Sequence, residues 1–238
     1  MGVITRLKRT ESPAWRSVLL QARAAPHWAM RGHVFARRAI AAHLASTDEP
    51  KLHFGAGPMT LPGWLDTDII SGDAHLNLGR RLPVPDHAFA YAFGEHVIEH
   101  VLESTARVLL PELYRVLRPG GVLRLATPDL AKLIAIYEDR NPEVDRDTYA
   151  RYLDEITGKR HERACQILND DLRLWGHQYV YDQEDLAAKL REAGFESVQR
   201  VEAGESPHPA LRGLESHAGP EWFDRAAVMC LEATRARA

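Results

Sequence analysis

The sequence KLHFGAGPMTLPGWLDTD, Lys51 to Asp68, contains the clearest indication of the fold. In this stretch a short apolar run enters a Gly-Ala-Gly turn, and a second apolar run ends in acidic residues. Gly55 and Gly57 lack a Cβ atom, so the backbone can turn sharply there and approach a ligand closely. An acid at the end of the next strand can accept hydrogen bonds from ribose hydroxyls. The pattern is therefore typical of a nucleotide-cofactor site at the edge of an α/β sheet.

The connection between the first two expected strands is short. Leu52 to Phe54 is predicted as the first strand and Trp64 to Asp68 as the second, with Pro58 and Pro62 between them. A crossover between parallel strands usually needs about a dozen residues or more. A loop or a single turn is therefore expected in place of the helix that normally follows the first strand.

Three more strands are expected before residue 130. They are predicted at Asp73 to Leu78, Phe89 to Phe93 and Val122 to Ala126. Apolar residues at helical spacing predict an amphipathic helix from Glu103 to Leu117. Pro119-Gly120-Gly121 is expected to stop this helix before the fifth strand begins.

The segment from Asp129 to about Asn169 is helical in pattern and charged, and it is longer than a simple crossover requires. Such an insertion, about residues 129–170, can cover a substrate site. Several aromatic residues in and after it are candidates either for a pocket lining or for the core: Tyr137, Tyr149, Tyr152, Trp175 and Tyr179.

A helix and a strand are expected late in the chain. Asp182 is suited to cap a helix from Gln183 to Ala193, and Gly194 is suited to end it before a strand at Phe195 to Val201. Trp222 to Thr234 is compatible with a last strand or with a helix.

The ordered motifs LHFGAGP, LPGW, TDI, GEHVIEH, RVLRPGGVLRLATPDL, GHQYVYD and AGF carry a resemblance to a known family. They resemble those of class I S-adenosylmethionine (SAM)-dependent methyltransferases, and among these the short-looped, methyltransferase-11-like subgroup. The match runs from about Lys51 to Gln199. It implies a Rossmann-like α/β fold: a mostly parallel seven-stranded sheet with helices on both faces. It also implies SAM as the cofactor.

The resemblance implies a cofactor site at the carboxyl ends of the first four strands. Asp68 is the expected ribose acid because it matches the family pattern, and Asp66 is the alternative. Asn77 falls where many relatives place an acid that contacts adenine. The full candidate set is Gly55, Ala56, Gly57, Asp68, Asn77 and Glu95.

Three departures from the wider family stand out, one of which is that Met59 or its neighbours replace a third glycine. His53 occupies the place of a common acid that helps to hold the amino group of SAM, and Ala90 stands where fourth strands often carry Asp. A core histidine is the structural alternative for His53. These departures raise a second hypothesis for function, a SAM-binding protein that has lost catalysis.

Candidate catalytic residues follow the fourth and fifth strands and occur in the late GHQYVYD motif. Methyl transfer is an in-line displacement that depends mainly on alignment. A base helps most when the acceptor is a hydroxyl. His96 is the first candidate for that role or for orienting the substrate, and His100, His177 and Asp129 are further candidates. Each has a structural hydrogen-bonding role as its alternative.

Two rival enzyme classes fit parts of the sequence. His96 to His100 reads HxxEH, a spacing that on a helix can bind zinc in a hydrolase. That motif needs a long preceding helix, whereas here it follows a predicted strand, so no metal ligand is assigned. An NAD-dependent oxidoreductase is the other rival. Against it, the acid follows the glycines by about ten residues rather than about 20.

Composition bounds the domain organisation. The chain has 238 residues, 45% of them apolar, which suits one large domain, predicted at residues 51–238, with an appendage. Residues 1–50 contain eight Lys or Arg and three acids, and form a predicted basic extension with helices near Pro13 to Ala24 and His27 to Ala45. Weak contact with a membrane surface and a mitochondrial presequence are the alternatives for this segment.

Other features limit the partners and the compartment. The formal net charge of −3 and the absence of an aromatic-flanked basic stripe argue against nucleic acid as a partner. Two cysteines without a CxxC spacing suit a reducing compartment, so a cytoplasmic location is expected, and no apolar run approaches about 18 residues. By analogy with relatives, the expected acceptor is a small molecule or a sugar methylated at oxygen. The sequence makes no prediction of oligomeric state.

Overall fold

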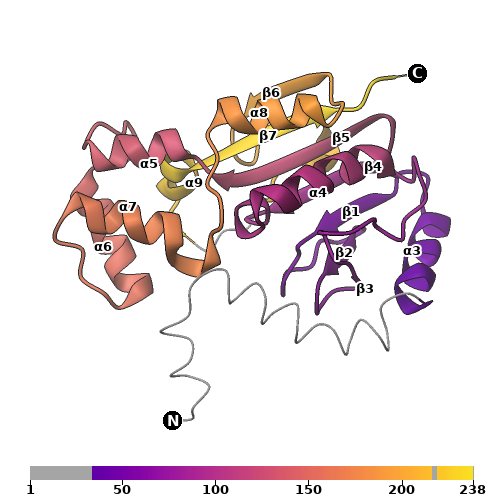
Figure 1. The fold of residues 1–238 in the computed structure, drawn as a ribbon, viewed down its shortest axis with the longest axis horizontal. Coiled ribbons are helices and arrows are strands. Elements are labelled where there is room, and N and C mark those ends of the chain that lie inside the picture. Colours follow the sequence, from indigo (N-terminus) through magenta and orange to yellow (C-terminus); the bar gives the residue numbers. More distant parts are fainter. Residues whose placement is uncertain (1–33, 216–218, 238) are drawn as a thin grey trace, which may run out of the picture.

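The computed structural model describes residues 34–215 and 219–237, which contain a seven-stranded sheet in the order β3-β2-β1-β4-β5-β7-β6 (Figure 1). The first five strands are parallel to one another, and β7 runs antiparallel to both β5 and β6. The predicted mostly parallel seven-stranded α/β fold is confirmed. The strands are β1 Lys51–Phe54, β2 Leu65–Asp68, β3 Ala74–His75, β4 Phe89–Glu95, β5 Leu117–Pro128, β6 Ser197–Val201 and β7 Val228–Thr234.

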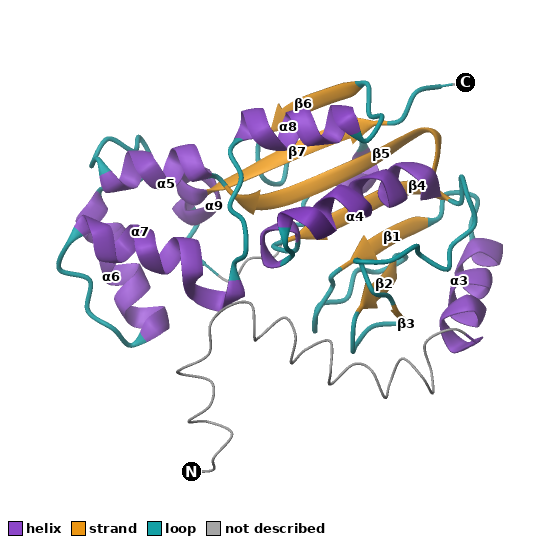
Figure 2. Ribbon diagram, in the orientation of Figure 1, coloured by secondary structure: helices purple, strands orange, loops and turns teal. Residues whose placement is uncertain are grey.

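Two long helices, α4 and α8, lie together over one face of the sheet (Figure 2). Their apolar side chains share one core with residues of β1, β4, β5 and β7. Helix α3 packs at the β3 edge, and α5, α6, α7 and α9 gather beyond the carboxyl end of β5. The helices are α3 Val34–Ser46, α4 Glu103–Val116, α5 Leu130–Tyr137, α6 Arg146–Thr157, α7 Ala164–Arg173, α8 Gln183–Glu192 and α9 Trp222–Ala227.

The other face of the sheet packs against a loop segment in the described part of the chain. Leu211 and Leu214 contact Phe93 and Val122 in a second, smaller core. The helical part of residues 202–215 is the single 3₁₀ turn Pro209–Leu211. Apolar side chains of a loop therefore cover this face of the sheet, as α4 and α8 cover the other face.

The β1–β2 connection contains no helix, as its length predicts. His53 is buried and donates from Nδ1 to Asp66 Oδ1 at 2.8 Å, and its ring stacks on Phe93. The Asp66 carboxylate also accepts from the backbone N–H of Leu61. Burial lowers the pKa of His53, and the hydrogen bond with Asp66 partly opposes this. Both side chains thus serve to hold the short loop.

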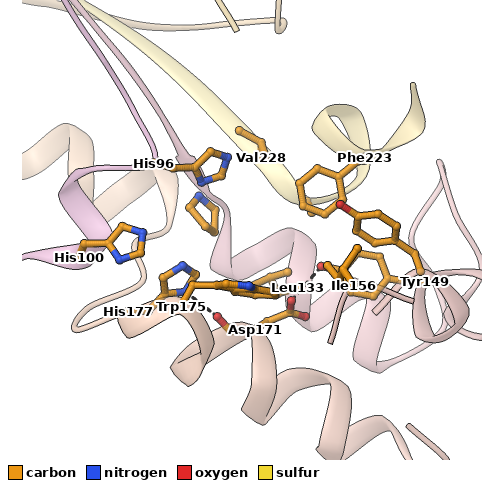
Figure 3. A pocket seen from close by; sticks show the side chains of 13 residues that line it. His96, His100, Leu133, Tyr149, Ile156, Asp171, Trp175, His177, Phe223 and Val228 are labelled. Carbon is orange, nitrogen blue, oxygen red and sulfur yellow. Dashed lines mark hydrogen bonds between the residues drawn. The ribbon is translucent and has the colours of Figure 1, made fainter. Parts of the chain in front are cut away.

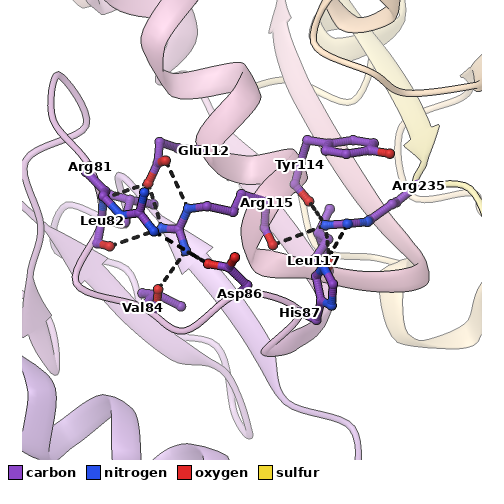
Figure 4. Close-up of polar contacts among 10 residues, drawn as sticks. All are labelled: Arg81, Leu82, Val84, Asp86, His87, Glu112, Tyr114, Arg115, Leu117 and Arg235. Carbon is purple, nitrogen blue, oxygen red and sulfur yellow. Dashed lines mark hydrogen bonds and ion pairs between the residues drawn. The ribbon is translucent and has the colours of Figure 1, made fainter.

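The helix α4 matches its predicted range to within one residue. It ends at Val116, and β5 begins at Leu117, so Pro119-Gly120-Gly121 lies inside the strand rather than in a turn before it. Beyond this end, Arg235 Nη1 donates to the carbonyl oxygens of Tyr114, Arg115 and Leu117 (Figure 4). An arginine at this position satisfies the last carbonyls of the helix.

Arg115 fixes the proline-punctuated loop that precedes β4 (Figure 4). Its guanidinium donates to the carbonyl oxygens of Leu82 and Val84. It also forms ion pairs with Asp86 and Glu112, at 2.6 and 2.7 Å. One side chain of α4 thereby satisfies backbone groups that a loop alone leaves without partners.

Two further differences concern the ends of the sheet. The third strand is only Ala74–His75, much shorter than the predicted Asp73 to Leu78. The segment from Trp222 to Thr234, for which a strand and a helix were the alternatives, contains both. It begins with the helix α9 and continues as the strand β7. The capping residue Asp182 accepts from the Asp185 N–H at the start of α8, as predicted.

Residues 1–33 lie outside the described structure. The predicted helix at Pro13 to Ala24 falls entirely within them, and the one at His27 to Ala45 overlaps α3. The basic segment remains an expectation from sequence, including its alternatives. Among the described residues, no helix has both the length and the apolar character needed to cross a membrane.

A buried ion cluster joins β5, β7 and the loop that covers the second face. Arg124 is completely buried and contacts Glu215 at 2.6 Å and Glu232 at 2.7 Å. It also donates to the carbonyl oxygens of Glu202 and Glu205. Because one cation faces two carboxylates without water, removing it leaves charges unpaired in the interior.

We expect Arg124→Ala to lower the free energy of unfolding by about 3 to 5 kcal/mol, measured by urea denaturation. The matched control is Arg118→Ala, which removes an exposed ion pair with Glu49 and should cost less than about 1 kcal/mol. Equal losses in the two variants would show that the Arg124 cluster does not stabilise the sheet.

Candidate functional site

Two cavities meet at the carboxyl edge of the sheet. The first, the strand-end cavity, has a volume of about 350 Å³ and lies at the ends of β1, β2, β3 and β4. The second, the aromatic cavity, has a volume of about 330 Å³ and lies among α5, α6, α7 and α9 (Figure 3). His96, His100 and Trp175 line both cavities. These three residues therefore mark a junction between the two spaces.

The strand-end cavity occupies the place where ligands bind in open α/β sheets. The strand order reverses between β1 and β4, and residues that follow both strands line the cavity. Gly55, at the end of β1, has a φ of +66°, and a Cβ there would lie 2.3 Å from Val97 Cγ2. Val97 is itself part of the cavity wall. Glycine is thus favoured at this position for two reasons: the backbone has a positive φ, and a Cβ would clash with Val97 in the cavity wall.

Asp68 presents an oriented carboxylate to the strand-end cavity. Its Oδ2 accepts from the Gly57 N–H and its Oδ1 from the Ile70 N–H, both at 3.2 Å. Asp66, the alternative ribose acid, is buried against His53 and does not line either cavity. Asn77 lines the strand-end cavity, and its Oδ1 accepts from the Gly79 N–H at 2.9 Å.

The other cofactor candidates lie behind or beside the strand-end cavity. Ala56 is buried, and its N–H donates to the carbonyl of Thr67, so it holds the turn against β2. Gly57 orients Asp68 through the backbone N–H. Glu95, at the end of β4, lines neither cavity.

A completely buried carboxylate, Glu99, organises the junction. Its Oε1 accepts from His96 Nδ1 at 2.9 Å, and its Oε2 accepts from Thr127 Oγ1 at 3.0 Å. Burial works to raise the pKa of Glu99, but the hydrogen bond and charge of His96 outweigh it and hold that pKa below its usual range. Burial works to lower the pKa of His96, and Glu99 likewise reverses this. His96 also has a φ of 49°, which is strained for a residue with a side chain.

His100 and His177 face each other beside Glu99, with ring centroids 4.9 Å apart. The His177 Nδ1–H donates to the carbonyl oxygen of Asp171 at 2.7 Å. Burial lowers the pKa of both histidines. Three of the four catalytic candidates, including His96, therefore come together at one place.

The fourth candidate, Asp129, lies outside both cavities. It is buried at the start of α5, where its Oδ1 accepts from the Ala131 N–H. Its Oδ2 accepts from Arg200 on β6 at 2.9 Å. The Asp129 side chain therefore caps α5 with one oxygen and forms an ion pair with Arg200 through the other.

Four large aromatic side chains contribute to the wall of the aromatic cavity (Figure 3). They are Tyr149, Tyr152, Trp175 and Phe223. A single carboxyl group, Asp171, lies among them and accepts from the Tyr149 hydroxyl at 2.9 Å. Burial raises the pKa of Asp171 to about 7. The cavity thus combines an apolar body with imidazoles at one end.

Three of these residues carry little signal in the sequence. Glu99 is marked there only by HxxEH, and this motif is not on a long helix, because His96 precedes a one-turn 3₁₀ helix, Ile98–His100. Asp171 follows Ile167 by four residues, and this spacing places it on the buried face of α7. Phe223 carries no local signal, because α9 reaches the cavity only through the fold.

Residues 55–125 match a family model described as a methyltransferase domain. The chain is similar to a solved SAM-dependent methyltransferase from Thermotoga maritima, described as a possible histamine N-methyltransferase, with 16% identity over 91% of this chain and 98% of that one (TM-score 0.44). It is similar to a SAM-dependent methyltransferase from Archaeoglobus fulgidus, with 16% identity over 85% and 93% (TM-score 0.45). It is also similar to phosphoethanolamine N-methyltransferase 2 from Haemonchus contortus, solved with SAM, with 10% identity over 84% of this chain and 52% of that one (TM-score 0.42). Comparison with curated protein sequences gave no match.

The family match places a methyltransferase domain at residues 55–125, from the end of β1 into β5. SAM is the cofactor that the sequence motifs lead us to expect. The strand-end cavity fits this cofactor in size, because ligand sites usually measure about 300 to 1,000 Å³. It also fits in chemistry, since an oriented carboxylate and an amide lie beside a glycine turn at the reversal of strand order.

We expect Gly55→Ala to lower SAM affinity at least about tenfold, because the new methyl group pushes Val97 into the strand-end cavity. Gly63→Ala is the matched control: its φ of +79° imposes the same kind of backbone strain, but nothing lies within 4 Å of the new Cβ. Calorimetric titration with SAM compares the two. Equal affinities would show that the wall at Val97 does not contact the cofactor.

Proposed function

We propose that the protein methylates a hydroxyl oxygen of a small molecule that has an apolar part, with the acceptor in the aromatic cavity and SAM in the strand-end cavity. The observation that carries the proposal is the junction: His96, His100 and Trp175 belong to the walls of both cavities. A donor and an acceptor in adjoining cavities can approach each other there. Alignment of this kind is the main contribution that a protein makes to an in-line displacement.

The proposed cofactor contacts come from the strand ends. Asp68, oriented by the N–H groups of Gly57 and Ile70, is suited to accept from the ribose hydroxyls. Gly55 allows close backbone approach, and Asn77 lies where an adenine contact is expected. When bound, SAM supplies a methyl group on a positively charged sulfur, which leaves as the neutral thioether when the acceptor attacks.

The proposed acceptor contacts follow from the wall of the aromatic cavity. Tyr149, Tyr152 and Phe223 offer flat apolar surfaces, which favour a molecule with an aromatic or aliphatic body. The volume of the aromatic cavity, about 330 Å³, suits a small molecule better than a polysaccharide chain. The imidazoles at the junction are the groups closest to where the reacting hydroxyl would lie.

His96 is the residue proposed to orient that hydroxyl and accept its proton. Its Nδ1–H donates to Glu99, so the lone pair of the neutral ring is on Nε2. Loss of the hydroxyl proton accompanies formation of the new carbon–oxygen bond, and a positioned base typically contributes 10²- to 10⁴-fold. Asp129 is not included in the proposed site, because its contacts hold α5 and β6 together.

We expect purified protein to bind SAM in calorimetry and to methylate a member of a panel of phenols and aliphatic alcohols. Asp68→Ala should weaken SAM binding at least about tenfold, whereas Asp147→Ala, an exposed acid on α6, should not change it. His96→Gln should keep SAM affinity within about threefold and lower kcat at least 10²-fold. SAM binding without transfer to any hydroxyl, together with transfer to an amine or thiol, would contradict the oxygen assignment.

A further inference from the structure

Three side chains that could bind a metal ion converge at the junction. One ligand atom each of Glu99, His100 and His177 lies within 4.8 Å of the others. Glu99 and His177 are buried, and His100 is partly exposed to the cavities. We propose that these three residues bind a divalent transition-metal ion, with Zn²⁺ as the expected occupant. The proposal does not depend on the identity of the methyl acceptor.

The donor set suits such an ion. Two imidazole nitrogens and one carboxylate oxygen form a common ligand set for Zn²⁺ and for other divalent metals of the first row.

The groups behind the three ligands support the same conclusion. The His177 Nδ1–H donates to the backbone carbonyl of Asp171, and the His100 ring is hydrogen-bonded to the backbone of Gly176. A histidine that binds metal with one nitrogen almost always donates the other N–H to a carbonyl or a carboxylate. In His177 this bond leaves Nε2 as the nitrogen with the lone pair. Thr127 and His96 orient the carboxylate of Glu99 in the same way.

The backbone also joins the two segments that supply the ligands. The carbonyl oxygen of Glu99 accepts from the N–H groups of Gln178 and Tyr179, at 2.6 and 3.2 Å. Glu99 and His100 belong to one of the joined segments, and His177 immediately precedes the other. The three ligands are therefore brought together by the fold before any ion binds.

The position of the cluster suits a site with an open coordination place. His100 and His177 both line the aromatic cavity, so a bound ion would face the space proposed for the acceptor. Three protein ligands with a vacant fourth place are typical of catalytic zinc sites. Ligand atoms on bonds of about 2.1 Å lie at most about 4.2 Å apart, so binding would draw the side chains slightly closer.

The test uses the full chain without an affinity tag, freed of metal by a chelator. Titration with Co²⁺ is followed by visible absorption, and Zn²⁺ affinity is measured by competition with a coloured chelator. We expect one ion per chain and at least a tenfold loss of affinity in His177→Ala. X-ray absorption of the zinc-loaded protein should show two imidazoles and only nitrogen or oxygen donors.

His208→Ala is the matched control, because His208 lies on the loop that covers the second face and packs against Tyr91. Its metal affinity should equal that of the unaltered protein. The proposal is overturned if the unaltered protein binds no metal, if His177→Ala binds as tightly, or if sulfur donors appear. A protein that binds SAM but no metal overturns this proposal alone, whereas one that binds metal but not SAM overturns the proposed function alone.

Discussion

The buried carboxylate of Glu99 is the interaction on which the functional end of the molecule depends. Its side chain joins His96 after β4 to Thr127 on β5, and its backbone carbonyl receives two N–H groups from the segment after α7. A carboxylate without water needs such partners, because an unpaired buried charge costs several kcal/mol. Glu99 thereby joins the sheet to the segment after α7, and its partner His96 lines both cavities.

A second constraint acts at the opposite side of the strand-end cavity. The loop after β1 has no helix to satisfy its backbone, and the pair of His53 and Asp66 does this instead. His53 stands where the wider family commonly has an acid that faces the cofactor. In this protein the His53 side chain is buried in the core, and Asp68 is an acid that lines the strand-end cavity.

Most of the sheet could be predicted because its signals are local. The apolar runs, the capping Asp182 and the glycine turn each depend on a few neighbouring residues, and the ordered motifs placed them in one fold. The contacts of Arg235 with the end of α4 could not be predicted, since the two are about 120 residues apart in sequence. For the site, the clustering of His96, His100 and His177 follows from strand ends and a late motif. Glu95 and Asp129 share that neighbourhood in sequence, but the strand pleat and a helix cap direct them elsewhere.

The place of β7 in the sheet sets an order for folding during synthesis. This strand is translated after β6, yet it lies between β5 and β6 and supplies the pairing partners of both. Until residues 228–234 leave the ribosome, β5 has an unpaired edge and β6 has no neighbour in the sheet. An exposed edge of an apolar strand is prone to pair with other chains. The nascent protein is therefore most vulnerable to aggregation just before its antiparallel strands join, and this is the stage at which a chaperone would protect it most.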